Sequence, residues 1–242
     1  MKKVTAAEVV VRRVRALIDD GAVRSGDRLP PERDLARQLG VSRPSVRSGL
    51  KSLSAMGIVQ IRQGAGTFIT GGPPVLASEP LSFLAALHGF SRAQMFESRL
   101  VLEVAVAGLA AERVTPERLM VISDETTEMF AALEASEAFL EHDIRFHQAV
   151  AAASDNPILG SLVEMVSKMF YEFRRRTIRA ATDKRQAAEE HRVIYQAIRA
   201  RDPERAREAM ASHLRRAALT QAQEETGTDA ASRQPDREEG NA

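Results

Sequence analysis

The sequence predicts a mainly α protein, with an N-terminal winged helix-turn-helix domain followed by a C-terminal all-helical bundle. Three observations lead to this prediction. The first 70 residues have the order helix, helix, helix and β-hairpin, and no strand signal follows them. Residues 1–70 carry 13 Lys and Arg against 6 Asp and Glu, whereas residues 71–223 carry 19 against 21. A basic head on a near-neutral body is typical of a protein whose head binds a polyanion.

Composition sets the broad class. Of the 242 residues, 44% are hydrophobic, which is enough to form a substantial core. Cysteine is absent, so no disulfide can form, and the composition suits a reducing cytoplasm. Glu8 and the Arg12-Arg13 pair interrupt the apolar start that a signal peptide would need, and no uncharged run is long enough to span a bilayer. We therefore expect a cytoplasmic protein with no membrane contact.

The first two elements of the head are expected helices. AAEVVVRRVRALIDDG places four apolar residues on one helical face, and Gly21 is a plausible stop; the face comprises Val10, Val14, Leu17 and Ile18. PPERDLARQLG predicts a second short helix, with proline at its start and Gly40 at its end.

The third helix and a hairpin complete the head. In VSRPSVRSGLKSLSAMG, Ser42 is a natural N-cap, and the buried stripe is Val46, Leu50 and Leu53. IVQIRQGAGTFI follows as two short β-rich runs around a glycine turn, which predicts a hairpin. The order is that of a winged helix-turn-helix.

The rest of the chain divides by composition. GGPPVLASEP, residues 71–80, reads as a linker. Residues 81–223 read as about six or seven helices, enough for a self-contained bundle. Their expected starts are Thr115-Pro116, Ser136, Asn156-Pro157 and Asp202-Pro203. Residues 224–242 are polar and acidic, and we expect a disordered tail there.

Two arginines on the third helix are candidates for reading DNA. Arg43 and Arg47 are one turn apart beside the apolar stripe, so both can point outward while the helix packs on the domain. The planar fork of arginine can hold guanine O6 and N7 together, or clamp a phosphate. Either arginine alone is more simply a solvated surface group. The pair at a helix N-terminus, followed by a hairpin, favours DNA binding.

The segment PPERDLARQLGVSRPSVRSGLKSLSAMGIVQIRQGAGTFI closely resembles the DNA-binding domain of GntR-type bacterial transcription regulators. The resemblance covers nearly all of residues 8–70. It implies that operator DNA is contacted by Arg33, Ser42, Arg43, Ser45, Arg47 and Gly66. Ala65 departs from the family pattern, because relatives often carry a basic or polar residue at this wing tip. The resemblance thus supports approach of the wing to the DNA backbone rather than to bases.

The stretch EHDIRFHQAV raises a separate question. Asp143 and His147 are one helical turn apart, a spacing that fits half a metal site, a catalytic pair or a polar face. His191 and His213 lie in further predicted helices, and the interior of a bundle is where ligands from facing helices converge. Three imidazoles and a carboxylate suit zinc, nickel or manganese. Spacing alone leaves all three interpretations open.

A second resemblance bears on this choice. Residues 80–222 look like the all-helical FCD effector domain of the FadR subfamily, and EHRVIYQAIRARDPERAREAMASHL is similar to its last two helices. The resemblance implies a divalent transition metal, zinc first and nickel or manganese as alternatives, bound by Asp143, His147, His191 and His213. His88 and His142 match no ligand position.

The same resemblance implies an effector site. Arg99, in ESRLVLEVAVAGLAAE, matches a position that faces the pocket and can pair with an effector carboxylate. The alternative is a surface pair between Arg99 and Glu103, one turn apart. Arg174, Arg175 and Arg176 fan across different helix faces, and we expect them to be solvated.

These features together predict a metabolite-responsive transcription regulator, not an enzyme. A homodimer is expected on a palindromic operator, with a small carboxylate or sugar-acid effector at the metal changing its DNA affinity. One alternative is a metal-dependent hydrolase or lyase tethered to DNA, although no general base is evident beyond the four ligands. A structural DNA-coating protein is another.

Overall fold

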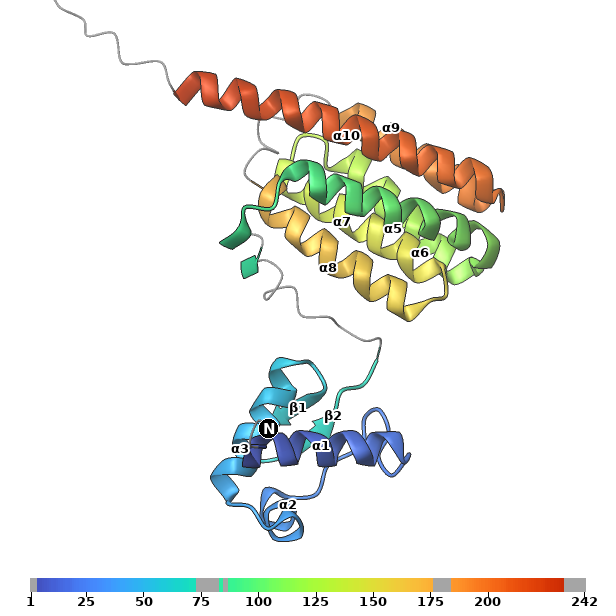
Figure 1. The fold of residues 1–242 in the computed structure, drawn as a ribbon. Helices are drawn as coiled ribbons and strands as arrows, with labels where there is room; N and C mark the ends of the chain where they lie inside the picture. Colours follow the sequence, from blue (N-terminus) through green and yellow to red (C-terminus); the bar gives the residue numbers. More distant parts are fainter. Residues whose placement is uncertain (1–3, 73–82, 85–86, 176–183, 233–242) are drawn as a thin grey trace, which may run out of the picture. The chain divides into compact units, whose positions relative to one another are not determined.

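The computed structural model describes residues 4–72, 83–84, 87–175 and 184–232 (Figure 1). The chain forms two compact units, Met1–Ala77 and Ser78–Ala242, and their boundary falls inside the expected linker. Residues 73–80 of that linker and residues 233–242 of the expected tail lie outside the described residues.

The first unit contains the expected three helices and hairpin. Its elements are α1 (Ala6–Asp19), α2 (Glu32–Leu39), α3 (Arg43–Ala55), β1 (Val59–Arg62) and β2 (Gly66–Ile69). The apolar residues of all five elements meet in one core, whose most buried members include Val10, Val14, Leu35, Val46, Leu50, Leu53 and Val59. The buried stripe predicted for the third helix is confirmed. Ile18 is the exception on the first helix, because its side chain is 38% exposed.

Local signals explain where the helices of this unit begin and end. Thr5 and Glu8 form a capping box at the start of α1. Gly40 ends α2 in the left-handed conformation, at φ 63°, where a Cβ would be strained. The α1 and α3 helices cross closely at Gly49, since a Cβ built there would lie 2.7 Å from Val10 Cβ. The third helix is thereby held on the body of the unit by its apolar side.

The hairpin is antiparallel, with Val59 opposite Ile69 and Arg62 opposite Gly66. An isolated bridge between Arg28 and Phe68 ties the loop before α2 to β2. The predicted wing is therefore present, and β2 is attached to the loop before α2.

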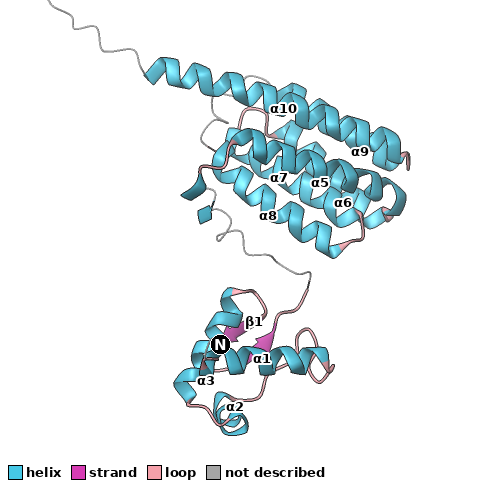
Figure 2. Ribbon diagram, viewed as in Figure 1, coloured by secondary structure: helices cyan, strands magenta, loops and turns pink. Residues whose placement is uncertain are grey.

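The second unit is a helical bundle, and its described part contains no strand (Figure 2). Its helices are α5 (Arg92–Arg113), α6 (Pro116–Ala131), α7 (Ser136–Ala153), α8 (Pro157–Arg174), α9 (Lys184–Arg199) and α10 (Pro203–Ser232). Figure 1 shows α10 lying along α9 and α5, and α10 makes extensive contacts with both helices. Among the described residues, no helix is both long and apolar enough to cross a membrane.

Three of the predicted helix starts are confirmed by their caps. Thr115 accepts a hydrogen bond from the backbone of Arg118, and Asn156 and Asp202 cap α8 and α10 in the same way. Ser136 differs. It is the first residue of α7 rather than its cap, and its hydroxyl accepts a hydrogen bond from Lys184 Nζ at 3.0 Å.

The C-terminal boundary of the bundle differs from the expectation. The sequence predicts disorder from Glu224, but the backbone of α10 continues as a helix to Ser232. This stretch, EETGTDAAS, contains two Glu and two Ala, which are good helix formers, beside Thr, Gly, Asp and Ser, which are not. Earlier turns of α10 pack on α5 and α9, so the helix is already nucleated when it reaches these residues.

Candidate metal centre and nucleic-acid interface

Three helices of the second unit bring four predicted residues to one point. The α7 helix supplies Asp143 and His147, α9 supplies His191, and α10 supplies His213. One ligand atom from each residue lies within 4.8 Å of those of the others. The three histidines are buried, with exposures of 2%, 0% and 3%, and the Asp143 side chain is 14% exposed.

Each of the three imidazoles has an acceptor beside its Nδ1. His147 Nδ1 lies 2.5 Å from Glu103 Oε2, and His213 Nδ1 lies 3.0 Å from Glu190 Oε2. His191 Nδ1 lies 2.7 Å from the carbonyl oxygen of Ala187. A neutral imidazole has a single N–H, so an acceptor at Nδ1 places the proton there and leaves a lone pair on Nε2. The hydrogen bonds at Nδ1 of His191 and His213 favour the tautomer that binds a metal through Nε2, and His147 Nδ1 has the Glu103 carboxylate beside it without a hydrogen bond.

The Nε2 atoms face one another and the carboxylate. His191 Nε2 lies 3.3 Å from His147 Nε2 and 3.2 Å from Asp143 Oδ1. With their protons on Nδ1, these atoms present only lone pairs to one another, which is unfavourable unless a cation lies between them. The residues therefore fit a divalent cation.

The ionisation states also suit ligand binding. Burial lowers the pKa of His147 against the opposing effect of Glu103, and burial together with the other imidazoles lowers the pKa of His213 well below its usual value. Burial alone would raise the pKa of Asp143, but the adjoining His191, His147 and Arg99 side chains outweigh burial and lower this pKa. The lowered pKa values favour neutral imidazoles at His147 and His213 and an ionised carboxylate at Asp143, the forms that ligate metals.

Arg99 and Glu103 form an ion pair beside the cluster. Arg99 Nε lies 2.6 Å from Glu103 Oε1, and the two side chains are only 2% and 4% exposed. The two residues do pair, as one alternative from the sequence had it, but the pair is not on the surface, because α5 carries both residues into the bundle. Burial opposes ionisation of Glu103, but Arg99 and His147 outweigh it and lower the pKa of Glu103 to about 2. Arg99 also lies over the Phe170 ring, 4.2 Å from its centroid.

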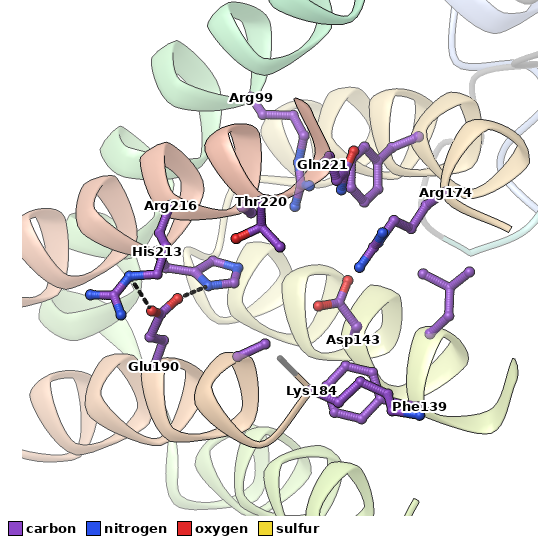
Figure 3. A pocket seen from close by; sticks show the side chains of 14 residues that line it. Arg99, Phe139, Asp143, Arg174, Lys184, Glu190, His213, Arg216, Thr220 and Gln221 are labelled. Atoms are coloured by element: carbon purple, nitrogen blue, oxygen red, sulfur yellow. Dashed lines mark hydrogen bonds and ion pairs between the residues drawn. The ribbon is translucent and has the colours of Figure 1, made fainter. Parts of the chain in front are cut away.

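A small cavity of about 60 Å³ adjoins the cluster (Figure 3). Arg99 and Gln221 line one side of it, and Asp143 lies across from them. Four cationic side chains are among its lining residues: Arg99, Arg174, Lys184 and Arg216. The expectation that Arg174 is a solvated surface residue is therefore wrong. Arg175 is exposed as expected, and Arg176 lies outside the described residues.

Several residues of this site were missed from the sequence. Glu103 and Glu190 contact the imidazoles from outside the cluster, and Glu190 also pairs with Arg216 at 2.7 Å. Glu190 directly precedes His191 and Glu103 follows Arg99 by one turn, so both had a local signal. Gln221 had none. His142 pairs with Glu125 at 2.7 Å instead of joining the cluster.

In the first unit, the predicted DNA-contacting residues of α3 lie at its N-terminal turn. The Ser42 hydroxyl accepts a hydrogen bond from the backbone N–H of Ser45 at 3.2 Å, and the two hydroxyls are 2.8 Å apart. Arg43 and Arg47 are both exposed. Because Val46 between them is fully buried, both arginines point away from the core.

Arg47 forms a two-point contact with α2. Its Nη2 and Nε lie 2.9 Å and 3.3 Å from the two carboxylate oxygens of Glu32. The hydrogen bond from Arg47 lowers the pKa of Glu32. Arg33 follows on α2 with its side chain 80% exposed, so it is accessible to a ligand.

Gly66 begins β2 at the base of the wing turn. Its φ of 116° is strained for any residue with a side chain, and a Cβ there would lie 2.8 Å from Arg28 Nε. Glycine therefore allows the turn and leaves room for the Arg28 guanidinium. Arg28 is a further cation at the wing that the sequence did not single out.

Residues 6–69 match the profile of bacterial regulatory proteins of the gntR family, and residues 94–216 match that of the FCD domain. The HTH-type transcriptional regulator LutR of Bacillus subtilis is 36% identical over 82% of this chain and 93% of its own length. The putative L-lactate dehydrogenase operon regulatory protein of Escherichia coli is 33% identical, over 86% of this chain and 83% of that relative. The structure of Streptococcus agalactiae GntR is 28% identical, with a TM-score of 0.67, and covers 88% of this chain and 99% of that one.

Proposed function

Because the chain belongs to the GntR family of bacterial transcription regulators, in the FadR-type subfamily with an FCD domain, we propose that its DNA affinity is set by a small carboxylate bound at a metal centre. The family consists of regulators, so the alternative of a tethered hydrolase or lyase is not supported.

One observation carries the metal assignment. Three imidazoles from α7, α9 and α10 have acceptors at Nδ1 and turn Nε2 towards Asp143 and one another. Zinc is the first candidate for this donor set, with nickel or manganese as alternatives. When bound, such a cation supplies open coordination positions and positive charge for an anionic ligand.

The cavity beside the cluster supports a carboxylate effector. Arg99 lines it, and its ion pair with Glu103 fixes the guanidinium within the bundle. A charge-assisted hydrogen bond from Arg99 to a carboxylate is therefore available without rearranging the side chain. One relative is named for the L-lactate dehydrogenase operon, which supports a small organic acid as the effector.

The first unit supports binding of operator DNA. Arg43 and Arg47 are exposed at the start of α3, and Arg33 is exposed on α2. We assign them, with Ser42, Ser45 and Gly66, to the DNA surface. Arginine forks there can read guanine, while Ser42, Ser45 and the Gly66 backbone serve the phosphates. A homodimer formed through the second unit would place two such surfaces on a palindromic site.

Effector control requires unequal effector affinity for the DNA-competent and DNA-incompetent states. The test is to titrate zinc-loaded protein into a labelled duplex, selected by the protein from a randomised pool, with and without L-lactate, glycolate, acetate and propanoate. We expect the fluorescence anisotropy to report a changed DNA affinity of the wild-type protein with at least one acid. In His191→Ala, the same acid should leave the DNA affinity unchanged. Acids that bind without changing DNA affinity would overturn the regulatory role.

A further inference from the structure

Gln221 presents an unsatisfied polar atom inside the bundle. Its side chain is buried, with 2% exposure, and lines the same cavity as Arg99 and Asp143 (Figure 3). Among the residues that the structure describes, its Oε1 has no hydrogen-bond partner, although it is fully removed from solvent. The residue itself is well anchored, because its backbone carbonyl accepts a hydrogen bond from Arg92 Nη1 at 3.1 Å.

A buried amide oxygen without a donor is unfavourable, because it has lost water and gained nothing in return. Arg99, its neighbour in Figure 3, hydrogen-bonds Glu103 through Nε and Nη2. An effector that occupies the cavity can supply the missing donor. A carboxylate group cannot do so, because an ionised carboxylate only accepts hydrogen bonds. A second functional group on the effector is needed.

The charge of the cavity distinguishes between possible donor groups. An ammonium group and a hydroxyl group can both donate to an amide oxygen. The cationic residues Arg99, Arg174, Lys184 and Arg216 line the cavity, and its carboxylates are Asp143 and Glu190. The cationic excess opposes an ammonium group, particularly once a divalent cation is bound. A neutral hydroxyl carries no such penalty.

The size of the cavity limits the effector further. A water molecule needs roughly 10–15 Å³ of cavity volume. A cavity of about 60 Å³ therefore has room for a few non-hydrogen groups beside the cluster. That space suits an acid of lactate size better than a six-carbon sugar acid.

We propose that Gln221 Oε1 accepts a hydrogen bond from a hydroxyl group of the effector, which makes the effector a short-chain hydroxy acid and Gln221 the residue that selects it. This inference rests on the proposed function, since it assumes that the acid occupies the cavity beside the metal ligands. It also explains how the site discriminates between acids. An analogue without the hydroxyl group leaves the Gln221 amide oxygen unpaired, so the site rejects it.

The test compares pairs of acids that differ only in the hydroxyl group. Isothermal titration of the zinc-loaded, full-length protein is performed with glycolate against acetate and with L- and D-lactate against propanoate. We expect at least one hydroxy acid to bind roughly a hundredfold more tightly than its deoxy partner. In Gln221→Met, which keeps the side-chain length but removes the acceptor, this ratio should fall by about tenfold or more, mainly through weaker hydroxy-acid binding.

The variants are checked for zinc content and melting temperature before titration. Thr220→Val serves as the matched comparison, because Thr220 lines the same cavity from the preceding position on α10. An unchanged ratio in Gln221→Met, or a collapse of the ratio in Thr220→Val instead, overturns the assignment to Gln221. Equal binding of each hydroxy acid and its deoxy partner by the wild-type protein overturns the effector class without any variant. If none of these acids binds, the proposed effector itself fails, and this inference fails with it.

Discussion

His147 Nε2 and His191 Nε2 lie 3.3 Å apart in the interior of the bundle, each on a ring whose Nδ1 faces an oxygen acceptor. Two helices, α7 and α9, hold these two nitrogen atoms together, and with the proton of each ring on Nδ1 neither nitrogen can donate to the other. Packing around the rings maintains the contact, since Phe146 meets the His191 ring edge-on at 4.7 Å between centroids. Two ligands of one shared cation need this arrangement, in which their Nε2 atoms are held close together and face the same point.

Removal of the metal should destabilise the second unit. A ligand that binds only the folded state adds about 2.7 kcal/mol when its concentration is 100 times Kd. Dialysis against a chelator should therefore lower the melting temperature measured by calorimetry, and zinc should restore it. An identical melting curve before and after chelation, with metal removal confirmed, would count against a bound cation.

Glu103→Gln should damage both stability and metal binding. The substitution removes the charge that neutralises buried Arg99, and breaking a buried ion pair costs about 3–5 kcal/mol. It also weakens the acceptor for His147 Nδ1, and such partners of metal ligands contribute about 10- to 100-fold in metal affinity. Denaturant unfolding and zinc titration measure the two effects.

Glu141→Gln is the control for this substitution. Glu141 pairs with Arg145 at 3.3 Å on the same helix that carries Asp143, but both side chains are about half exposed, at 51% and 53%. Little change is expected, because exposed pairs contribute little. Equal effects of the two substitutions would show that the burial of Glu103 is unimportant.

Replacement of Arg43 or Arg47 by alanine should weaken binding to the selected duplex. A bidentate contact to guanine is lost in each case, which corresponds to roughly ten- to a hundredfold in affinity. Anisotropy with the selected and a scrambled duplex separates specific from general binding. Arg145→Ala in the second unit is the control. Unchanged affinity of both α3 variants would remove these arginines from the DNA surface.

Glu32 should orient Arg47 for this contact. Glu32 accepts from Nε and Nη2, which leaves the Nη1 side of the guanidinium for the DNA. In Glu32→Ala the preference for the selected over the scrambled duplex should fall, while scrambled DNA binds more tightly because a negative charge is lost. Asp19→Asn is the matched control, since it removes a carboxylate charge from the same unit but its partner, Arg15 on α1, is not assigned to the DNA surface. If Glu32→Ala bound both duplexes more tightly by the same factor, Glu32 would only compete with the DNA phosphates for Arg47 and would not orient it.

The sequence predicted most of the first unit because its signals are local. Ser42 caps α3 and Gly40 ends α2, and Val46, Leu50 and Leu53 recur at helical spacing. Each signal acts within a few residues, so no knowledge of the tertiary fold was needed. The helical end of α10 was missed for the opposite reason, because its continuation follows a segment stabilised by packing on other helices.

The site in the second unit depended on tertiary structure. Spacing placed Asp143 and His147 on one face, but only the fold, or a resemblance to one, could bring His191 and His213 to them. Arg174 was read as solvated because it belongs to a run of arginines, and its position at the end of α8 turns it to the cavity. Gln221 could not be found from the sequence, since burial of its amide depends on the packing of α10.

Elemental analysis of the purified protein tests the central claim most directly. The wild-type protein should contain about one divalent transition-metal ion per chain. His191→Ala should lose it, because His191 Nε2 lies 3.3 Å from His147 Nε2 and 3.2 Å from Asp143 Oδ1. His142→Ala should retain it, because His142 is adjacent to Asp143 in the sequence but pairs with Glu125. A wild-type protein without metal after growth in zinc-supplemented medium, or full metal content in His191→Ala, would contradict the account.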